Sequence, residues 1–191
     1  RILIDCTPDF RQQMLRLCMD NHLDAVLITH EHYDHVGGID DLRPFTYKND
    51  LPIFSDEYAI THLRQRLPYC LVENRYPGVP QLTTHIVEPG EQWSVGQIRI
   101  TALRAYHGKL PILGFRLGDL AYLTDITELP EESFEMILNC LMAECVEAYQ
   151  ELDLEQDKGI IENILFSGVW TRFEAWKKKK GEKEWKKYVY F

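Results

Sequence analysis

The residues best suited to chemistry in this 191-residue chain lie in one short stretch, H-E-H-Y-D-H at residues 30–35. The stretch directly follows an apolar run at residues 25–28, so we expect a buried strand to end where the candidate ligands begin. In an extended backbone alternate side chains lie on the same side, so His30 and His32 can bind one cation. The aspartate and the last histidine of the stretch can reach a second cation. Imidazole and carboxylate ligands suit zinc, with manganese or iron as alternatives.

The order H-x-H-x-D-H is far more demanding than a pair of histidines. The alternative interpretation is a polar loop whose histidines only make hydrogen bonds, and the spacing disfavours it. Gly37 and Gly38 follow directly, where a chain that turns closely around such a site has no room for Cβ atoms. Elsewhere, His62 in a predicted helix has no second ligand three or four residues on, and His85 lies in a predicted strand. We expect structural roles for both.

Two further candidates follow predicted strands farther along the chain. His107 ends a strand that runs on from residues 97–103, and Asp125 follows the strand at residues 120–123. Rigid elements commonly present functional side chains from the loops at their ends. The sequence therefore predicts that the loops carrying His30, His107 and Asp125 converge on one site.

The elements that must position these residues can be predicted from periodicity, breakers and turn formers. The loops at 88–91 and around Gly118 are predicted turns; the first joins an antiparallel strand pair and the second a hairpin. Side chains that step by three and four predict one long amphipathic helix near the C-terminus. The predicted strands are residues 1–5, 25–29, 51–54, 82–87, 97–103, 112–117 and 120–123, and the predicted helices are residues 10–19, 39–43 (ended by Pro44), 56–67 and 131–152.

Composition limits the class of protein. The net charge is -9, 45% of residues are hydrophobic, and no apolar run approaches the ~20 residues of a membrane helix. The five cysteines are scattered and include no C-x-x-C pair, which favours a reducing cytoplasm over a disulfide framework. Residues 170–191 hold eight Lys and Arg against three Asp and Glu, mixed with aromatic residues. Such a segment can contact RNA or an anionic membrane, but a solvated tail is the preferred interpretation.

Residues 29–38 resemble the signature of the metallo-β-lactamase superfamily of binuclear metallohydrolases, and residues 30–43 are similar to its PhnP-like phosphodiesterase branch. The resemblance covers about residues 1–138. It implies an α/β fold, an incomplete αββα sandwich over residues 1–138, followed by a helical and basic extension at 139–191. It also implies strands and a cysteine-rich segment before Arg1, so we expect that the front of the domain precedes this chain.

The resemblance further implies a site for two divalent metal ions, zinc or manganese. Redox relatives with di-iron centres usually carry Glu at the second motif position, so His32 favours hydrolysis. Asp34, if it also contacts the nucleophile, would orient it, which makes it the candidate catalytic residue. The implied ligands are His30, His32 and His107 for the first metal, Asp34 and His35 for the second, and Asp125 as a bridge.

The chain departs from this family at its C-terminal end. Relatives carry another histidine on a late strand, whereas this sequence contains no histidine after His107, so the second metal is expected to bind weakly and no general acid can be named. The expected function is hydrolysis of a small cyclic or nucleotide-derived phosphodiester. An RNA-processing nuclease of the same fold and a metal-binding protein without catalysis are the alternatives. We expect no membrane partner, and leave nucleic acid and a homodimer open.

Overall fold

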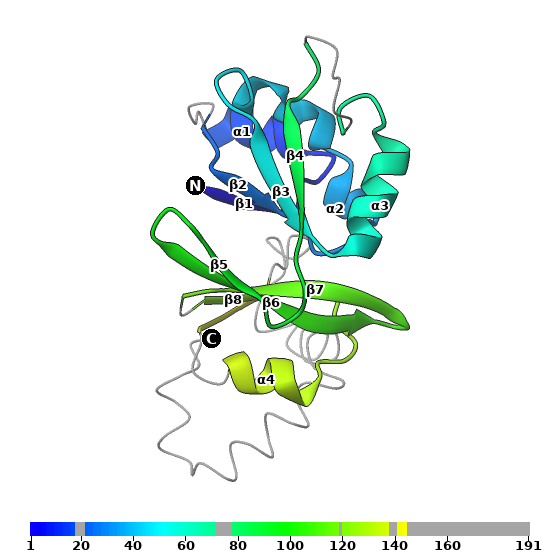
Figure 1. The fold of residues 1–191 in the computed structure, drawn as a ribbon, viewed down its shortest axis with the longest axis vertical. Helices are drawn as coiled ribbons and strands as arrows, with labels where there is room; N and C mark the ends of the chain where they lie inside the picture. The colour runs from blue at the N-terminus through cyan, green and yellow to red at the C-terminus, as the bar shows by residue number, and fades with distance from the viewer. Residues whose placement is uncertain (18–21, 72–77, 119, 138–140, 145–191) are drawn as a thin grey trace, which may run out of the picture. The chain divides into compact units, whose positions relative to one another are not determined.

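The computed structural model describes residues 1–17, 22–71, 78–118, 120–137 and 141–144 (Figure 1). The contacts between residues divide the chain into two units, Arg1–Ile98 and Arg99–Phe191, which are described separately below.

The first unit is built on a parallel sheet. Apolar residues occupy both faces of its inner strand β2, all three of whose residues are fully buried, as a strand covered on both sides requires. The register places Val26 opposite Leu3 on one side and opposite Ile53 on the other. The strand order is β1 (Ile2–Ile4), β2 (Ala25–Leu27), β3 (Leu51–Ser55) and β4 (Leu82–Ile86).

One expectation for this part of the chain is wrong, and one strand was not expected. The strand at residues 82–87 was expected to pair antiparallel with residues 97–103, but β4 pairs parallel with β3, with Ile53 opposite Thr84. The reason is that α3 (Glu57–Arg66) lies between β3 and β4, and a helical crossover returns the chain in the same direction. A further strand that the sequence analysis missed, β5 (Gln92–Val95), precedes residue 98.

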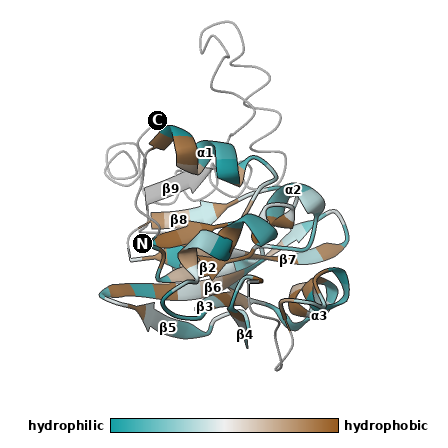
Figure 2. Ribbon diagram, turned by 90° about the horizontal axis from the view of Figure 1, so that it is seen from above, coloured by the Kyte–Doolittle hydropathy of each residue, from teal (hydrophilic) through white to brown (hydrophobic). Residues whose placement is uncertain are grey.

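The helical segments described in this unit are α1 (Phe10–Leu17), α2 (Tyr33–Val36), the 3-10 helix η1 (Ile39–Phe45) and α3. The side chain of Asp56 caps α3 by accepting a hydrogen bond from the Ala59 amide at 2.9 Å. Both α1 and α3 carry hydrophilic as well as hydrophobic residues (Figure 2). The hydrophobic side chains join one core, which includes Phe10, Val26, Ile28, Ile39, Leu42, Ile53, Ile60 and Leu63.

Pro44 does not end the helix before it, which corrects the expectation from the sequence. The 3-10 helix continues through Pro44 to Phe45, and the amide of Thr46 still donates to the carbonyl of Arg43. A proline near the end of such a short helix removes one hydrogen bond, and its fixed φ angle suits the helical region.

The second unit contains successive antiparallel strands, followed by a helix and a further strand. β6 (Ile98–His107) pairs antiparallel with β7 (Leu110–Leu117), and β7 pairs antiparallel with β8 (Leu120–Leu123) in the hairpin that the sequence predicts. α4 (Glu131–Ile137) follows, and its Ser133 hydroxyl accepts a hydrogen bond from the Arg104 amide of β6. The core of this unit includes Leu103, Ala105, Ile112, Leu123, Phe134 and Ile137.

The long helix predicted over residues 131–152 is wrong at Leu141–Glu144. Leu141–Glu144 form strand β9, which pairs parallel with β8, with Leu120 opposite Leu141. Periodicity cannot separate helix from strand in a short apolar run, and the exposed edge of β8 supplies backbone partners that only the folded chain brings near. The rest of that predicted helix, the end of the helix predicted at 10–19 and the basic tail lie outside the described residues.

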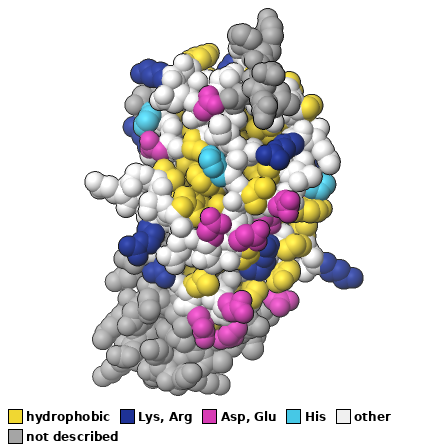
Figure 3. All heavy atoms as spheres, viewed as in Figure 1, with side chains coloured by type: hydrophobic (Ala, Val, Ile, Leu, Met, Phe, Trp, Pro, Cys, Tyr) yellow, Lys and Arg dark blue, Asp and Glu magenta, His cyan; other side chains and the backbone are white. Residues whose placement is uncertain are grey.

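Among the described residues, no helix is long and apolar enough to cross a membrane. On the face drawn in Figure 3, acidic, basic and hydrophobic side chains are interspersed.

Replacing leucine by alanine at one buried and one exposed position tests the core of the first unit. Leu63 of α3 is fully buried, so Leu63→Ala should lower the free energy of unfolding by about 2–5 kcal/mol through lost burial and a residual cavity. Leu15 of α1 is 62% exposed, so Leu15→Ala should change it by no more than about 0.5 kcal/mol. Urea denaturation measures both, and equal effects of the two variants would contradict this packing.

Candidate metal centre

The loop after β2 carries the histidine-rich stretch. The amide of Ile28 still donates to Phe54 of β3, so the chain leaves the sheet at Thr29. After His32 the backbone turns into helix α2, which begins at Tyr33. His32 precedes this helix with φ -62° and ψ 147°, and its carbonyl accepts from the amide of His35 at 3.0 Å. The helical turn is what returns the last histidine toward the first.

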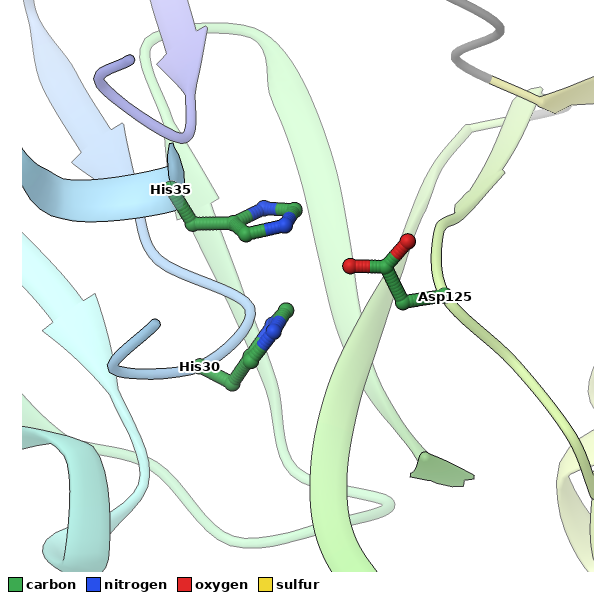
Figure 4. A group of neighbouring side chains, drawn as sticks. All are labelled: His30, His35 and Asp125. Atoms are coloured by element: carbon green, nitrogen blue, oxygen red, sulfur yellow. The ribbon is translucent and has the colours of Figure 1, made fainter. Parts of the chain in front are cut away.

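Three imidazole rings gather in the first unit. The ring centroids of His30 and His32 are 4.6 Å apart, and those of His30 and His35 are 4.1 Å apart. His30 and His35 are both buried, and a ring nitrogen of each lies within 4.8 Å of the other. Figure 4 shows these two rings side by side, one from the loop and one from α2. Protonated rings this close would repel one another, so the arrangement suits neutral rings that face a common cation.

A residue that the sequence analysis treated only as the end of a strand holds this cluster together. Asp5 follows β1 and is buried, with 4% of its surface exposed. Its Oδ1 accepts from the Thr29 amide at 2.8 Å, its Oδ2 accepts from the Thr29 hydroxyl at 2.9 Å, and Oδ2 lies 2.8 Å from Nδ1 of His35. The signal was present in the sequence, because Asp5 is an acidic residue directly after an apolar strand, as His30 is a histidine after one.

These hydrogen bonds fix which ring nitrogens carry hydrogen. A carboxylate only accepts, so Nδ1 of His35 is the N–H that donates to Asp5. The single hydroxyl hydrogen of Thr29 goes to Asp5, so its oxygen accepts from Nδ1 of His30 at 3.0 Å. In both rings Nε2 is therefore the acceptor nitrogen, the form in which histidine binds metals.

The spacing of the ring nitrogens fits a divalent cation. Nε2 of His30 lies 3.1 Å from Nδ1 of His32. Two nitrogen ligands at about 2.0–2.1 Å from a tetrahedral zinc ion are roughly 3.3 Å apart. The donor set, its burial and the orienting carboxylate of Asp5 are thus those of a metal site.

Asp34 and His35 are also neighbours at this site. The carboxylate Oδ2 of Asp34 lies 3.4 Å from Nε2 of His35, and 76% of the Asp34 side chain is exposed. The candidate ligands expected for a second cation therefore lie beside each other, with the carboxylate on the solvent side.

Neighbouring backbone segments hold the loop in place. Cys6 donates from its amide to the carbonyl of His35 at 2.7 Å and accepts from the amide of Gly38 at 2.9 Å. A Cβ atom on Gly38 would lie 2.1 Å from the carbonyl oxygen of Thr7, so no other residue fits there. Arg66 of α3 donates to the carbonyl of Glu31 from the other side.

The nearby thiol of Cys6 is a poor metal ligand. Burial, with the charges of Asp41 and Asp5 as smaller causes, raises the pKa of the Cys6 thiol far above its usual value. The thiol therefore stays protonated, whereas metals bind the thiolate.

The other two predicted ligands lie in the second unit. His107 ends β6, and Asp125 follows β8 on an exposed position with a left-handed φ of 54°, which is uncommon for a residue other than glycine (Figure 4). The loop that carries Asp125 is tied to the end of β6. Thr127 donates from its hydroxyl to the carbonyl of Tyr106 at 2.9 Å and accepts from the amide of Gly108 at 2.7 Å.

Two histidines expected to be structural pack against aromatic rings. The ring of His62 lies 4.5 Å from that of Tyr58 in the same helix. The ring of His85 in β4 stacks on Phe54 of β3, with centroids 4.8 Å apart and an interplanar angle of 22°. These contacts agree with packing roles.

Known proteins resemble this chain in sequence. The sequence model of the β-lactamase superfamily domain matches residues 1–152. An octanoyltransferase of Porphyromonas gingivalis is 45% identical over 140 residues, which are 73% of this chain and 28% of that protein. A ribonuclease Z of Thermosynechococcus vestitus is 29% identical over 118 residues, which are 61% of this chain and 29% of that protein. The chain therefore spans less than a third of these curated relatives.

A solved structure agrees with the sequence matches. The crystal structure of a diphosphatase from the PhnP family superimposes with a TM-score of 0.65 and 32% sequence identity, and the match covers 74% of this chain and 54% of that one. The parallel and antiparallel sheets described above are those of this fold. The match over residues 1–152 and the shared architecture lead to one conclusion: this chain belongs to the β-lactamase superfamily domain family and has the metallo-β-lactamase fold.

Proposed function

We propose that this chain is a metal-dependent phosphodiesterase that hydrolyses a small cyclic or nucleotide-derived phosphodiester. The observation that carries the proposal is the cluster of His30, His32 and His35, in which Asp5 and Thr29 direct the buried rings of His30 and His35 to present Nε2. Members of this superfamily are metal-dependent hydrolases. The 32% identity with a PhnP-family diphosphatase supports phosphate chemistry in particular.

The ligands we propose divide between two cations, zinc or manganese. Residues of the first unit provide most of them, and two residues at strand ends of the second unit complete the set. In this proposal His30, His32 and His107 would hold the first cation, Asp34 and His35 would hold the second, and Asp125 would be a ligand shared by both. Cations bound there would supply Lewis acidity that activates water and neutralises charge on the phosphoryl oxygens.

The chain's own residues set the geometry for this chemistry. Asp5 keeps a proton on Nδ1 of His35, and Thr29 keeps one on Nδ1 of His30, so neither ring can rotate away without losing a buried hydrogen bond. The exposed carboxylate of Asp34 accepts a hydrogen bond from the attacking water and orients it toward phosphorus. Asp34 is therefore the catalytic residue in this proposal.

A ribonuclease acting on longer RNA is the second candidate, and the 29% identity with a ribonuclease Z favours it. The same ligands would serve, because a fold does not determine a substrate. Octanoyl transfer is not proposed, because the imidazole and carboxylate groups of the site are ligands for a cation that activates water, which makes hydrolysis the chemistry they support. Comparing turnover of 2′,3′-cyclic AMP with cleavage of a 20-nucleotide RNA separates the two candidates.

Substitution of a ligand should abolish hydrolysis. With the zinc- or manganese-loaded full chain, His30→Ala should reduce kcat/KM for bis(p-nitrophenyl) phosphate at least about 100-fold, because a cation site is lost. His62→Ala is the matched control, since this histidine packs on Tyr58, and we expect its kcat/KM to stay within about twofold. Wild-type protein that binds metal but shows no turnover would instead support a metal-binding protein without catalysis, and refute the proposal.

Removal of the orienting carboxylate should weaken metal binding without removing a ligand. Asp5→Asn replaces an oxygen that accepts from His35, so the zinc affinity should fall about 10- to 100-fold. Titration against a chromophoric chelator measures the affinity, and circular dichroism verifies that the variant is folded. Asp9→Asn, at an exposed acidic residue four positions on, should leave the affinity unchanged. A folded Asp5→Asn protein with wild-type zinc affinity would show that Asp5 does not act on the ligands.

A further inference from the structure

Glu31 carries a buried carboxylate that the proposed metal centre does not use as a ligand. The residue lies between His30 and His32 and is 7% exposed, and its Oε2 atom is buried without a hydrogen-bond partner. Buried side-chain oxygens in folded proteins almost always have such a partner, and a buried charge that lacks one raises the free energy of the folded state. This carboxylate therefore points to an interaction that the polypeptide alone does not supply.

The charge of Glu31 is not compensated in the way that the charge of Asp5 is. The carboxylate of Asp5 accepts from the amide and the hydroxyl of Thr29 and from the ring of His35. The contact of Glu31 with Arg66 is instead made by the main chain, since the guanidinium donates to the carbonyl oxygen of Glu31. Among the described residues Arg66 forms no ion pair, so its charge is not paired with the Glu31 carboxylate.

The side chain of Glu31 lies on the opposite side of the loop from the candidate ligands. Nε2 of His30 and Nδ1 of His32 are 3.1 Å apart, so both rings are on one side of the backbone. In an extended segment the side chain between them projects to the other side, and His32 has the extended angles φ -62° and ψ 147°. Glu31 therefore does not coordinate the cation that these rings would bind, and its carboxylate would lie roughly 10 Å from that cation.

A buried charge still acts over such a distance. Buried charges are screened far less than exposed ones, because the effective dielectric constant of the protein interior is low. A divalent cation at the histidine cluster would attract the carboxylate and offset part of the unfavourable free energy of burying it. Without the cation, the whole of that unfavourable free energy falls on the folded state.

We propose that the buried carboxylate of Glu31 strengthens the binding of divalent cations at the histidine cluster through its charge, without coordinating them, and destabilises the metal-free fold. This inference rests on the metal centre of the proposed function and not on the hydrolysis. Glu31 contacts neither the cation nor the substrate, so it is not a catalytic residue. Its charge couples cation binding to the stability of the first unit.

The test removes the charge and keeps the shape of the side chain. In the full chain, Glu31→Gln should lower the zinc affinity about tenfold, measured by competition with a chromophoric chelator. The same substitution should raise the Tm of the metal-free protein by about 2–4 °C, followed by circular dichroism. A residue that only supports the packing of the loop would instead lower both quantities, so the opposite signs identify the effect of the charge.

Two further variants are the controls. Glu31→Asp keeps the charge and should retain the zinc affinity within about threefold, although its shorter side chain packs less well. Glu88→Gln removes a charge from an exposed position of the same unit and should leave the zinc affinity within about twofold and the Tm within about 1 °C.

Several results would overturn the inference. These are a Glu31→Gln protein with wild-type zinc affinity, one whose Tm falls together with its affinity, and one that does not fold. A loss of affinity in Glu31→Asp as large as in Glu31→Gln would overturn it too, since the charge would then not be the cause.

The outcome for Glu31 is separate from the outcome for the proposed function. If the wild type binds zinc but hydrolyses no phosphodiester, the proposed function fails, and the affinity and the Tm of the variants still decide the role of Glu31. If the wild type hydrolyses a phosphodiester and Glu31→Gln binds zinc as tightly as it does, the function stands and this inference fails. A wild-type protein that binds no zinc would overturn both.

Discussion

The hydrogen bonds to the carboxylate of Asp5 are the interaction on which the candidate site depends. A buried carboxylate is costly in free energy unless hydrogen bonds replace its water, and this one receives them from the Thr29 amide, the Thr29 hydroxyl and the ring of His35. The same bonds join the end of β1 to the loop after β2 and to α2. Satisfying one buried charge therefore also orients two histidines and sets their tautomers.

Close backbone approach is the second constraint on this part of the first unit. The segment after β1 bonds to the end of α2 through both polar backbone groups of Cys6, and Gly38 lies against the carbonyl of Thr7 with no space for a side chain. Gly37 in turn leaves room for Tyr33 and Pro8. Both glycines thus allow a close approach of neighbouring groups that a side chain at either position would prevent.

Family membership and activity rest on different grounds in this protein. The family follows from a match over most of the chain, but the matched proteins are named for acyl transfer, RNA processing and diphosphate cleavage. Such diversity is expected where one metal-binding scaffold accepts different substrates. The choice of a phosphodiester as the proposed substrate therefore depends on the side chains at the site and on the likeness to the PhnP-family diphosphatase.

The sequence alone determined the features that local chemistry controls. The spacing H-x-H-x-D-H predicted the candidate metal ligands, the apolar run at residues 25–28 located the strand before them, and Asp56 and Gly118 correctly marked a helix start and a hairpin. Only the tertiary structure decided which strands pair. β4 joins β3 in parallel, and Leu141–Glu144 form a strand along β8 where periodicity predicted a helix. Asp5 acts on Thr29 and His35, which are 24 and 30 residues away in the chain. Periodicity records only which side of an element is apolar, whereas strand partners and buried hydrogen bonds depend on segments that meet after the chain has folded.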